Sequence, residues 1–284
     1  MIFMNKIARL RTRFPCHGLV GSVWLYFLVC IAAAEEKTPG IVDGRATKGM
    51  SIELLSEVKS LREGEAFWVG LSIQHDPGFH TYWKNPGVVG VPTQIQWELP
   101  EGYTASDIHW PYPEKSMMAE YPCFAYKRDV LLRVLITPPA EVELEQVTFT
   151  AMVNWMCCSS VCYPDSALFS LTLPVGDGLM DQRWKAVFAE AKKSMPKVSD
   201  KVSATLLSQK DAEWIQIRIE SEFPIVSVFS ADGQTTPDLP FQLMKEAKGI
   251  WRFKAKRSEY GPEGCKTFPL IAETDAGFFT VIAR

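Results

Sequence analysis

The sequence predicts an all-β protein built around an antiparallel β-sandwich. Apolar and polar residues alternate from about residue 50 onward, which is the pattern of strands that are buried on one face. Proline and glycine fall in the gaps between the alternating stretches, where turns are needed. One stretch near the middle has helical spacing instead. Several short strands separated by turn signals are typical of a β-sandwich.

Four strands are expected before residue 176. The clearest alternation runs from Val147 to Trp155 and leads directly into a cysteine-rich stretch. The stretch that begins at Val130 differs, because Leu131 and Leu135 make it apolar on both faces. The four predicted strands cover residues 95–99, 130–136, 147–155 and 169–175.

A helix is expected after these strands. Trp184, Val187, Phe188 and Ala191 follow the spacing of one helical face, and Pro196 ends the pattern. Alternation then resumes at residues 215–219, 251–253 and 278–282. We therefore expect a sandwich domain over residues 48–176, a connecting helix over 177–197 and a second, smaller β domain over 198–284. A single large sandwich is the alternative.

The first 34 residues have the features of a secretory signal peptide. A basic stretch ends at Arg13, and an uncharged run from Phe14 to Ala34 closes with three alanines. We expect cleavage after this run and a periplasmic mature protein. An uncleaved N-terminal membrane anchor is the alternative, because the run from Gly18 to Ala34 nearly spans a bilayer.

Composition narrows the class of protein. Of 284 residues, 47% are apolar and 22% are charged, which is the balance of a globular protein rather than a disordered or polytopic membrane one. The formal net charge is −3, and four of the 30 basic residues lie in the leader. An acidic surface does not attract phosphate backbones, so we expect no nucleic-acid partner.

The cysteines carry the chemical signal. Two of the seven lie in the leader, and the five that remain are Cys123, Cys157, Cys158, Cys162 and Cys265. An odd number leaves at least one thiol unpaired or bonded to another molecule. Spacing allows a disulfide from Cys162 to either Cys158 or Cys157. So small a ring adds little stability, which favours reactivity over a structural staple, although a staple and half of a zinc site remain alternatives.

Several motifs in order resemble a known family. They are PGFHTYWKNPG at 77–87, GVPT at 90–93, WELP at 97–100, WPYP at 110–113, Tyr126, WMCC at 155–158 and CYP at 162–164. Together they resemble the periplasmic N-terminal domain of the DsbD-type thiol:disulfide interchange proteins, especially the ScsB-like branch. The resemblance covers roughly residues 48–176, and a weaker similarity extends to the C-terminus. His80, in the first motif, is expected to make a structural hydrogen bond rather than to transfer protons.

The resemblance implies an immunoglobulin-like sandwich with one redox cysteine pair. The family's cysteine positions fall on Cys158 and Cys162, with Cys162 forming mixed disulfides and Cys158 resolving them. The implied electron donor is a membrane-embedded DsbD-, ScsB- or CcdA-like protein, and the implied clients are oxidised thioredoxin-like periplasmic proteins. The chain ends at Arg284 without the family's membrane and thioredoxin-like segments, so we expect the donor to be a separate polypeptide. No cofactor beyond the disulfide is implied.

Two departures from the family pattern, together with Cys265, add candidates. Cys157 stands where the family usually has an aliphatic residue, so it is an accessory thiol that could compete in exchange or pair with Cys123. Cys265 is expected to be a buried small residue, with pairing to either of these as the alternative. The family's aromatic loop over the cysteine pair is altered here, and its candidate cap residues are Phe124, Tyr121 and Tyr126. A cation that favours the Cys162 thiolate is expected from the fold, with Lys127 and Arg128 as candidates.

Two functions of other classes compete with this interpretation. Thiolate and thioether ligands select Cu(I), so Cys157, Cys158, Cys162 and Met156 could form a copper-binding module. Alternatively, the disulfide only staples a loop in a non-catalytic interaction domain.

Overall fold

The structure is a computed structural model that describes residues 41–42, 44–207, 213–235, 241–259, 261 and 265–284. The predicted signal peptide lies outside these ranges. Residues Pro39–Arg284 form one compact unit. Within the described ranges, no helix is long and apolar enough to span a membrane.

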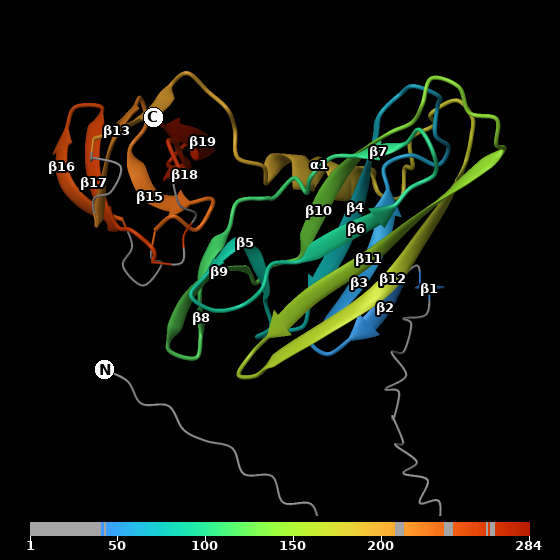
Figure 1. Cartoon of the computed structure of the whole chain (residues 1–284), viewed down its shortest axis with the longest axis horizontal. Helices are drawn as coiled ribbons and strands as arrows, with labels where there is room; N and C mark the ends of the chain where they lie inside the picture. The colour runs from blue at the N-terminus through green and yellow to red at the C-terminus, as the bar shows by residue number, and fades with distance from the viewer. Residues whose placement is uncertain (1–40, 43, 208–212, 236–240, 260, 262–264) are drawn as a thin grey trace, which may run out of the picture. The chain divides into compact units, whose positions relative to one another are not determined.

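The prediction of an all-β fold is confirmed, and an immunoglobulin-like sandwich occupies the first part of the unit (Figure 1). One sheet has the strand order β1 (Ile41–Val42), β12 (Cys162–Pro174), β11 (Gln146–Cys158) and β6 (Gln94–Glu98). The facing sheet has the order β2 (Gly44–Thr47), β3 (Met50–Ser56), β4 (Phe67–His75), β10 (Val130–Thr137) and β7 (Thr104–Ala105). A third, small sheet joins β5 (Thr81–Gly87), β9 (Tyr121–Tyr126) and β8 (Glu114–Met118).

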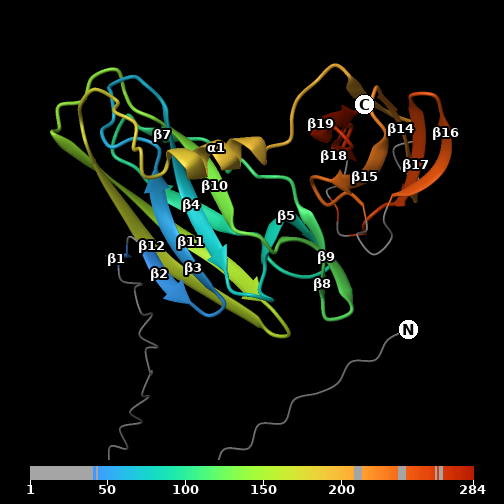
Figure 2. The same cartoon turned by 180° about the vertical axis from the view of Figure 1, so that it is seen from behind.

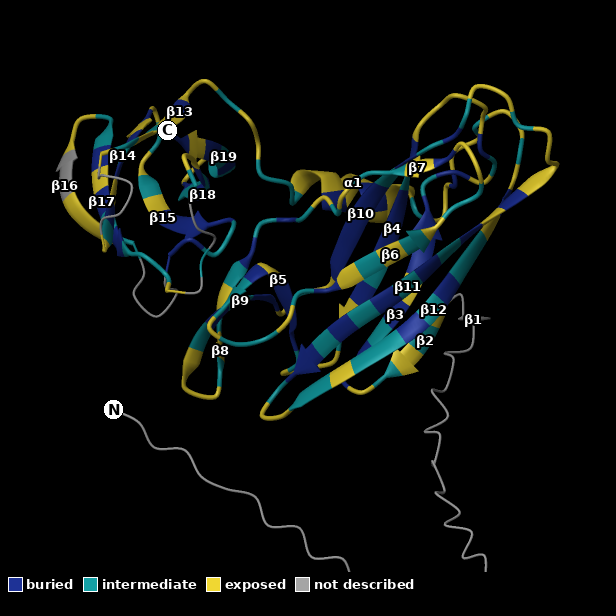
Figure 3. Ribbon diagram, in the orientation of Figure 1, coloured by how far each residue is buried: buried dark blue, intermediate teal, exposed yellow. Residues whose placement is uncertain are grey.

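The core of the sandwich lies between the two larger sheets. Along β11, buried side chains alternate with less buried ones from Val147 to Cys157, as the banding in Figure 3 shows. Phe149 is fully buried at the centre, with its ring centroid 5.9 Å from Phe67 and 5.4 Å from Tyr103. The apolar residues of the alternating sequence are therefore those whose side chains are buried against the facing sheet.

The predicted helix is present as α1 (Lys185–Lys193), and it explains the strand that is apolar on both faces. Figure 2 shows α1 lying across the sheet that contains β4 and β10. Phe188 and Ala191 of the helix form a small apolar cluster with Leu55 and Leu131. Leu131 thus faces the helix, whereas its neighbours Val130 and Leu132 belong to the sandwich core.

Strands after the helix form two further sheets. One has the order β13 (Val202–Leu206), β14 (Trp214–Ser221), β17 (Ile250–Lys256) and β16 (Gln242–Ala247). The other has the order β15 (Ile225–Ser230), β18 (Phe268–Thr274) and β19 (Gly277–Ala283). The predicted strands at 215–219, 251–253 and 278–282 lie in β14, β17 and β19. The domain boundaries proposed from the sequence stay predictions.

We expect Phe149→Ala to destabilise the fold by about 3–5 kcal/mol, because it removes a fully buried ring from between the sheets. Val198 offers a control, since its side chain is 88% exposed and Val198→Ala should cost less than about 0.5 kcal/mol. Urea unfolding followed by fluorescence measures both. Equal effects of the two substitutions would contradict this account of the core.

Candidate functional site: a cross-strand disulfide on a sheet face

The cysteine cluster lies at the end of the long hairpin formed by β11 and β12. Only residues 159–161 form the turn of this hairpin. Cys157 and Cys158 are the last residues of β11, and Cys162 is the first residue of β12. The strands continue because a turn of three residues brings Cys158 directly opposite Cys162.

Cys158 and Cys162 are joined by a disulfide, with their Cα atoms 4.1 Å apart. The backbone N–H and C=O of Cys158 point away from Cys162 and toward His80. The Cys158 N–H donates to the His80 carbonyl, and the His80 N–H donates to the Cys158 carbonyl, both at 2.9 Å. Cys158 and Cys162 are therefore a non-hydrogen-bonded pair of the hairpin. Side chains approach most closely in pairs of that kind, which places the two sulfurs within bonding distance.

The sheet face that carries the disulfide extends past Cys158 to His80 and Tyr82. His80 lies opposite Cys158, and Tyr82 follows two residues later on the same face. Tyr82 lies opposite Ala125 of β9, and Cys123 is two residues from Ala125. One sheet face thus gathers residues that are far apart in the sequence.

The side chains on this face form a separate apolar cluster around the disulfide. Its buried members are Tyr82, Cys123, Ala125 and Cys158, and its partly buried members are Val89, Met118, Met156 and Cys162. Gly90 has a φ of +92°, and a Cβ there would lie 2.2 Å from the Tyr82 ring, so only glycine lets this loop cross Tyr82.

The two sulfurs differ in exposure. Cys158 is fully buried, whereas Cys162 is partly exposed. The Tyr82 hydroxyl lies 3.8 Å from the Cys162 Sγ. Burial raises the pKa of Tyr82 to about 12, so the phenol stays protonated near neutral pH. Of the two bonded cysteines, Cys162 is therefore the one that is partly open to solvent, and a hydroxyl lies beside its sulfur.

Cys157 faces the opposite side of the sheet, because adjacent residues of a strand point to opposite faces. Its side chain is fully buried in the sandwich core. Burial first and the charge of Asp76 second raise the pKa of its thiol to about 11. The proposed copper ligands are therefore not brought together, since Cys157 faces away from Cys158 and Met156. Among the described residues, no group of three or more His, Cys, Asp or Glu side chains could hold a metal ion.

The remaining cysteines do not form the alternative pairs. Cys123 and Cys157 both carry free thiols, so they are bonded neither to each other nor to Cys265. Burial raises the pKa of Cys123, although a hydrogen bond from Ser116 partly offsets that effect. Cys265 is partly exposed rather than buried.

Of the three aromatic residues expected to cap the disulfide, Phe124 and Tyr126 pack elsewhere, whereas Tyr121 lies opposite Met118, a member of the cluster around the disulfide. The Phe124 ring packs edge-on against Trp83 at 6.2 Å and Phe229 at 5.3 Å. Tyr126 is fully buried, and its hydroxyl donates to the Pro111 carbonyl. Tyr121 is 50% exposed near the tip of the β8–β9 hairpin. The cover over the disulfide comes instead from the cluster that contains Tyr82.

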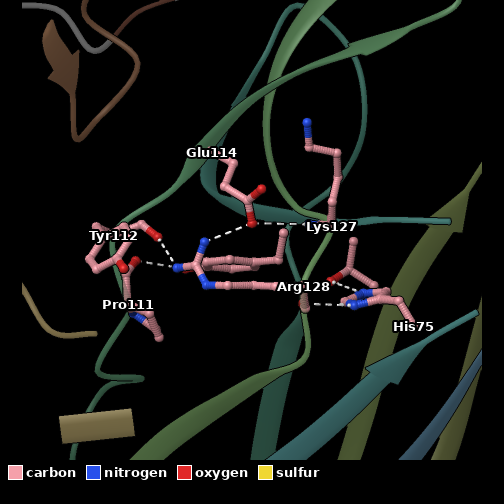
Figure 4. Close-up of polar contacts among 8 residues, drawn as sticks. His75, Pro111, Tyr112, Glu114, Lys127 and Arg128 are labelled. Atoms are coloured by element: carbon pink, nitrogen blue, oxygen red, sulfur yellow. Dashed lines mark hydrogen bonds and ion pairs between the residues drawn. The ribbon is translucent and has the colours of Figure 1, made fainter. Parts of the chain in front are cut away.

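Of the two candidate cations, Arg128 is held by its side chain in a polar network beside this sheet, and Lys127 joins the network through its backbone N–H (Figure 4). The Arg128 guanidinium donates to Glu114 at 2.6 Å and to the Tyr112 carbonyl at 2.9 Å. The Lys127 N–H also donates to the Glu114 carboxylate. Lys127 lowers the pKa of Cys123 through its charge, whereas Arg128 is engaged by Glu114. The network anchors the end of β9.

Sequence analysis missed the neighbours that matter most. Tyr82 was only part of a motif, yet its hydroxyl lies beside Cys162. His80 was expected to make a structural hydrogen bond. Its backbone pairs with Cys158, whereas the Nε2 atom of its ring is buried with no partner among the described residues. The motif at 77–87 was the available signal, because it places polar aromatic residues at alternate positions next to a turn.

Comparison with known proteins gives the family of this fold. The sequence model for "Thiol:disulfide interchange protein DsbD, N-terminal" matches residues 53–174, which include the whole hairpin and the disulfide. Residues 53–174 are a DsbD-type N-terminal domain. The resemblance inferred from the motifs is thereby confirmed, and the DsbD-type domain holds every residue of the cluster.

A solved structure has the same fold over a longer stretch. The N-terminal periplasmic domain of ScsB from Proteus mirabilis is 15% identical and matches with a TM-score of 0.61, covering 83% of this chain and 93% of that one. So broad a match takes in strands outside the DsbD-type domain. A conserved domain protein from Bacillus anthracis is 10% identical over 82% of this chain and 77% of that one, with a TM-score of only 0.25. No curated protein sequence matches the chain.

In the oxidised, folded protein we expect neither Cys123 nor Cys157 to react with iodoacetamide at about pH 8. Both thiols are buried and both pKa values are raised, so the reactive thiolate is scarce. Peptide mass mapping measures the modification, and the same protein in concentrated guanidinium chloride is the control in which both should react. Rapid modification of Cys157 without denaturant would contradict its placement in the core.

Proposed function

We propose that this protein is an exported thiol:disulfide interchange protein whose Cys158–Cys162 pair cycles between dithiol and disulfide. The observation that carries the proposal is a disulfide with one buried and one partly exposed sulfur on a DsbD-type N-terminal domain. The proposed location is the periplasm. It is supported by the leader sequence and by the periplasmic location that the name of the similar ScsB domain states.

The difference in exposure supports the proposed roles of the two cysteines. An incoming thiolate can reach only the Cys162 Sγ, where it forms a mixed disulfide and displaces the Cys158 thiolate. A second thiol of the donor then displaces Cys162, which leaves the pair reduced and the donor oxidised. In the next half-cycle the Cys162 thiolate attacks a client disulfide, and Cys158 displaces the reduced client. Two electrons pass in each half-cycle.

The Tyr82 hydroxyl supports this assignment. In the reduced state its O–H can donate to the Cys162 thiolate, because the raised pKa keeps the phenol protonated. Hydrogen bonds to a charged group favour the charged form, so the Cys162 pKa would fall. A neutral donor thus takes the role that the sequence gave to Lys127 or Arg128.

The surface beside the disulfide suits a protein partner. Exposed apolar side chains lie on segments that flank the apolar cluster: Val88, Val91, Met117, Tyr121 and Val161. Val88 and Val91 flank Val89, Met117 precedes Met118, and Val161 precedes Cys162. Such residues commonly form the centre of protein interfaces. The proposed partners are a membrane-embedded DsbD-, ScsB- or CcdA-like donor and oxidised thioredoxin-like clients.

A trapping experiment tests the proposal. Reduced Cys158→Ser protein, mixed with an oxidised thioredoxin-like protein, should accumulate a mixed disulfide at Cys162, because the thiol that would resolve it is gone. Non-reducing electrophoresis and mass mapping measure the complex. Cys162→Ser should give no complex, and Cys123→Ser should exchange like the unaltered protein. Absence of a complex, or a complex through another cysteine, would count against the proposal.

A further inference from the structure

His80 is the residue most closely tied to Cys158. Their backbones exchange two hydrogen bonds of 2.9 Å, so the two residues lie directly opposite each other on neighbouring strands. Side chains of such a pair project from the same face with their Cβ atoms about 5 Å apart. The imidazole of His80 is thereby held next to the Cys158 side chain, on the side away from Cys162.

The imidazole is buried without a complete set of hydrogen bonds. The side chain is only 4% exposed, and its Nε2 atom has no hydrogen-bond partner among the described residues. The edge-on contact with the Tyr82 ring, at 5.2 Å between centroids, supplies no hydrogen bond to that atom. A buried polar atom without a partner costs free energy, so it calls for an explanation.

Reduction of the disulfide creates the missing partner. Cys158 then carries an S–H group that is fully buried and needs an acceptor. Among the other described polar groups of this face, the Tyr82 hydroxyl lies at Cys162 and the Ser116 hydroxyl at Cys123. The His80 ring lies on the strand position opposite Cys158, and its Nε2 atom has no partner among the described residues. We propose that His80 accepts the proton of the Cys158 thiol in the reduced protein and so positions Cys158 as the resolving nucleophile.

Cys158 resolves the mixed disulfide by proton transfer to His80 followed by attack on Cys162. A client joined to Cys162 through a mixed disulfide faces the Cys158 thiol, whose proton moves to the His80 Nε2. The Cys158 thiolate forms a bond to the Cys162 Sγ, and the bond from Cys162 to the client sulfur breaks. The client leaves as a thiolate, which takes up a proton from the imidazolium or from water. The client is reduced, and the Cys158–Cys162 pair is oxidised.

Charges around His80 favour a neutral acceptor in the oxidised state. Burial first and the charge of Lys127 second lower the pKa of His80, so its ring is neutral near pH 7. The charge of His80 in turn lowers the pKa of His75 from β4. Tyr82 and Cys157 are further titratable neighbours of His80, and both stay protonated near pH 7 because their pKa values are raised.

A first test measures the pKa of His80 in the oxidised and reduced protein. In histidine-labelled protein followed by NMR, reduction should lower the apparent pKa of His80, because the Cys158 S–H then donates to the neutral ring and protonation of His80 would break that hydrogen bond. His109, which is exposed, should titrate identically in both states. The same His80 titration before and after reduction would overturn the proposal.

A second test measures the rate at which Cys158 resolves a mixed disulfide at Cys162. In a Cys265→Ser background, Ellman's reagent first forms a mixed disulfide at Cys162, and Cys158 then releases the second aromatic thiolate in a unimolecular phase. His80→Phe should slow that second phase by about 100-fold near pH 7 and shift its rise to higher pH, while the first phase changes little. His109→Phe is the matched control and should leave both phases unchanged. An unchanged second phase in His80→Phe would overturn the proposal.

This inference rests on the proposed function only in requiring that the pair can be reduced. If the disulfide is structural, the trapping experiment fails, whereas the His80 titration in chemically reduced protein still reports the hydrogen bond. The two ideas can therefore fail separately.

Discussion

The backbone pairing between Cys158 and His80 is the contact on which the rest of the site depends. It joins the long β11–β12 hairpin to the segment that enters β5, so that one continuous sheet face carries the disulfide, His80 and Tyr82. Because side chains alternate along a strand, this register also decides which of the two neighbouring cysteines forms the disulfide with Cys162. A shift by one residue would turn Cys157 outward and bury Cys158 in the sandwich core.

The same face creates the asymmetry that thiol exchange needs. Tyr82 and the loop at Gly90 cover Cys158, while Cys162 stays partly exposed at the start of β12. An attacking thiolate therefore has one sulfur to reach, and the departing sulfur remains inside an apolar cluster. Burial of Cys158 disfavours its thiolate unless a neighbour takes the proton, which makes the adjacent imidazole important for the return step.

The sequence predicted those features that depend on local pattern. The alternation of apolar and polar residues predicted the strands around Phe149 and Ile217, and helical spacing predicted the helix at Phe188. The motifs gave the family and the Cys158–Cys162 pair. The packing of Phe124 was not predicted, because its position is set by its contacts with Trp83 and Phe229, which no local pattern reports. The partnership of His80 with Cys158 joins residues 78 positions apart, so only the folded sheet reveals it.

The central claim is that the Cys158–Cys162 pair is built to exchange rather than to staple the hairpin. The most direct test is its reduction potential, measured by equilibration with glutathione or dithiothreitol, alkylation and mass mapping of the two cysteines. We expect a value of about −180 to −270 mV, the range of proteins that exchange disulfides. A value below about −300 mV would mark a structural disulfide and would contradict the account.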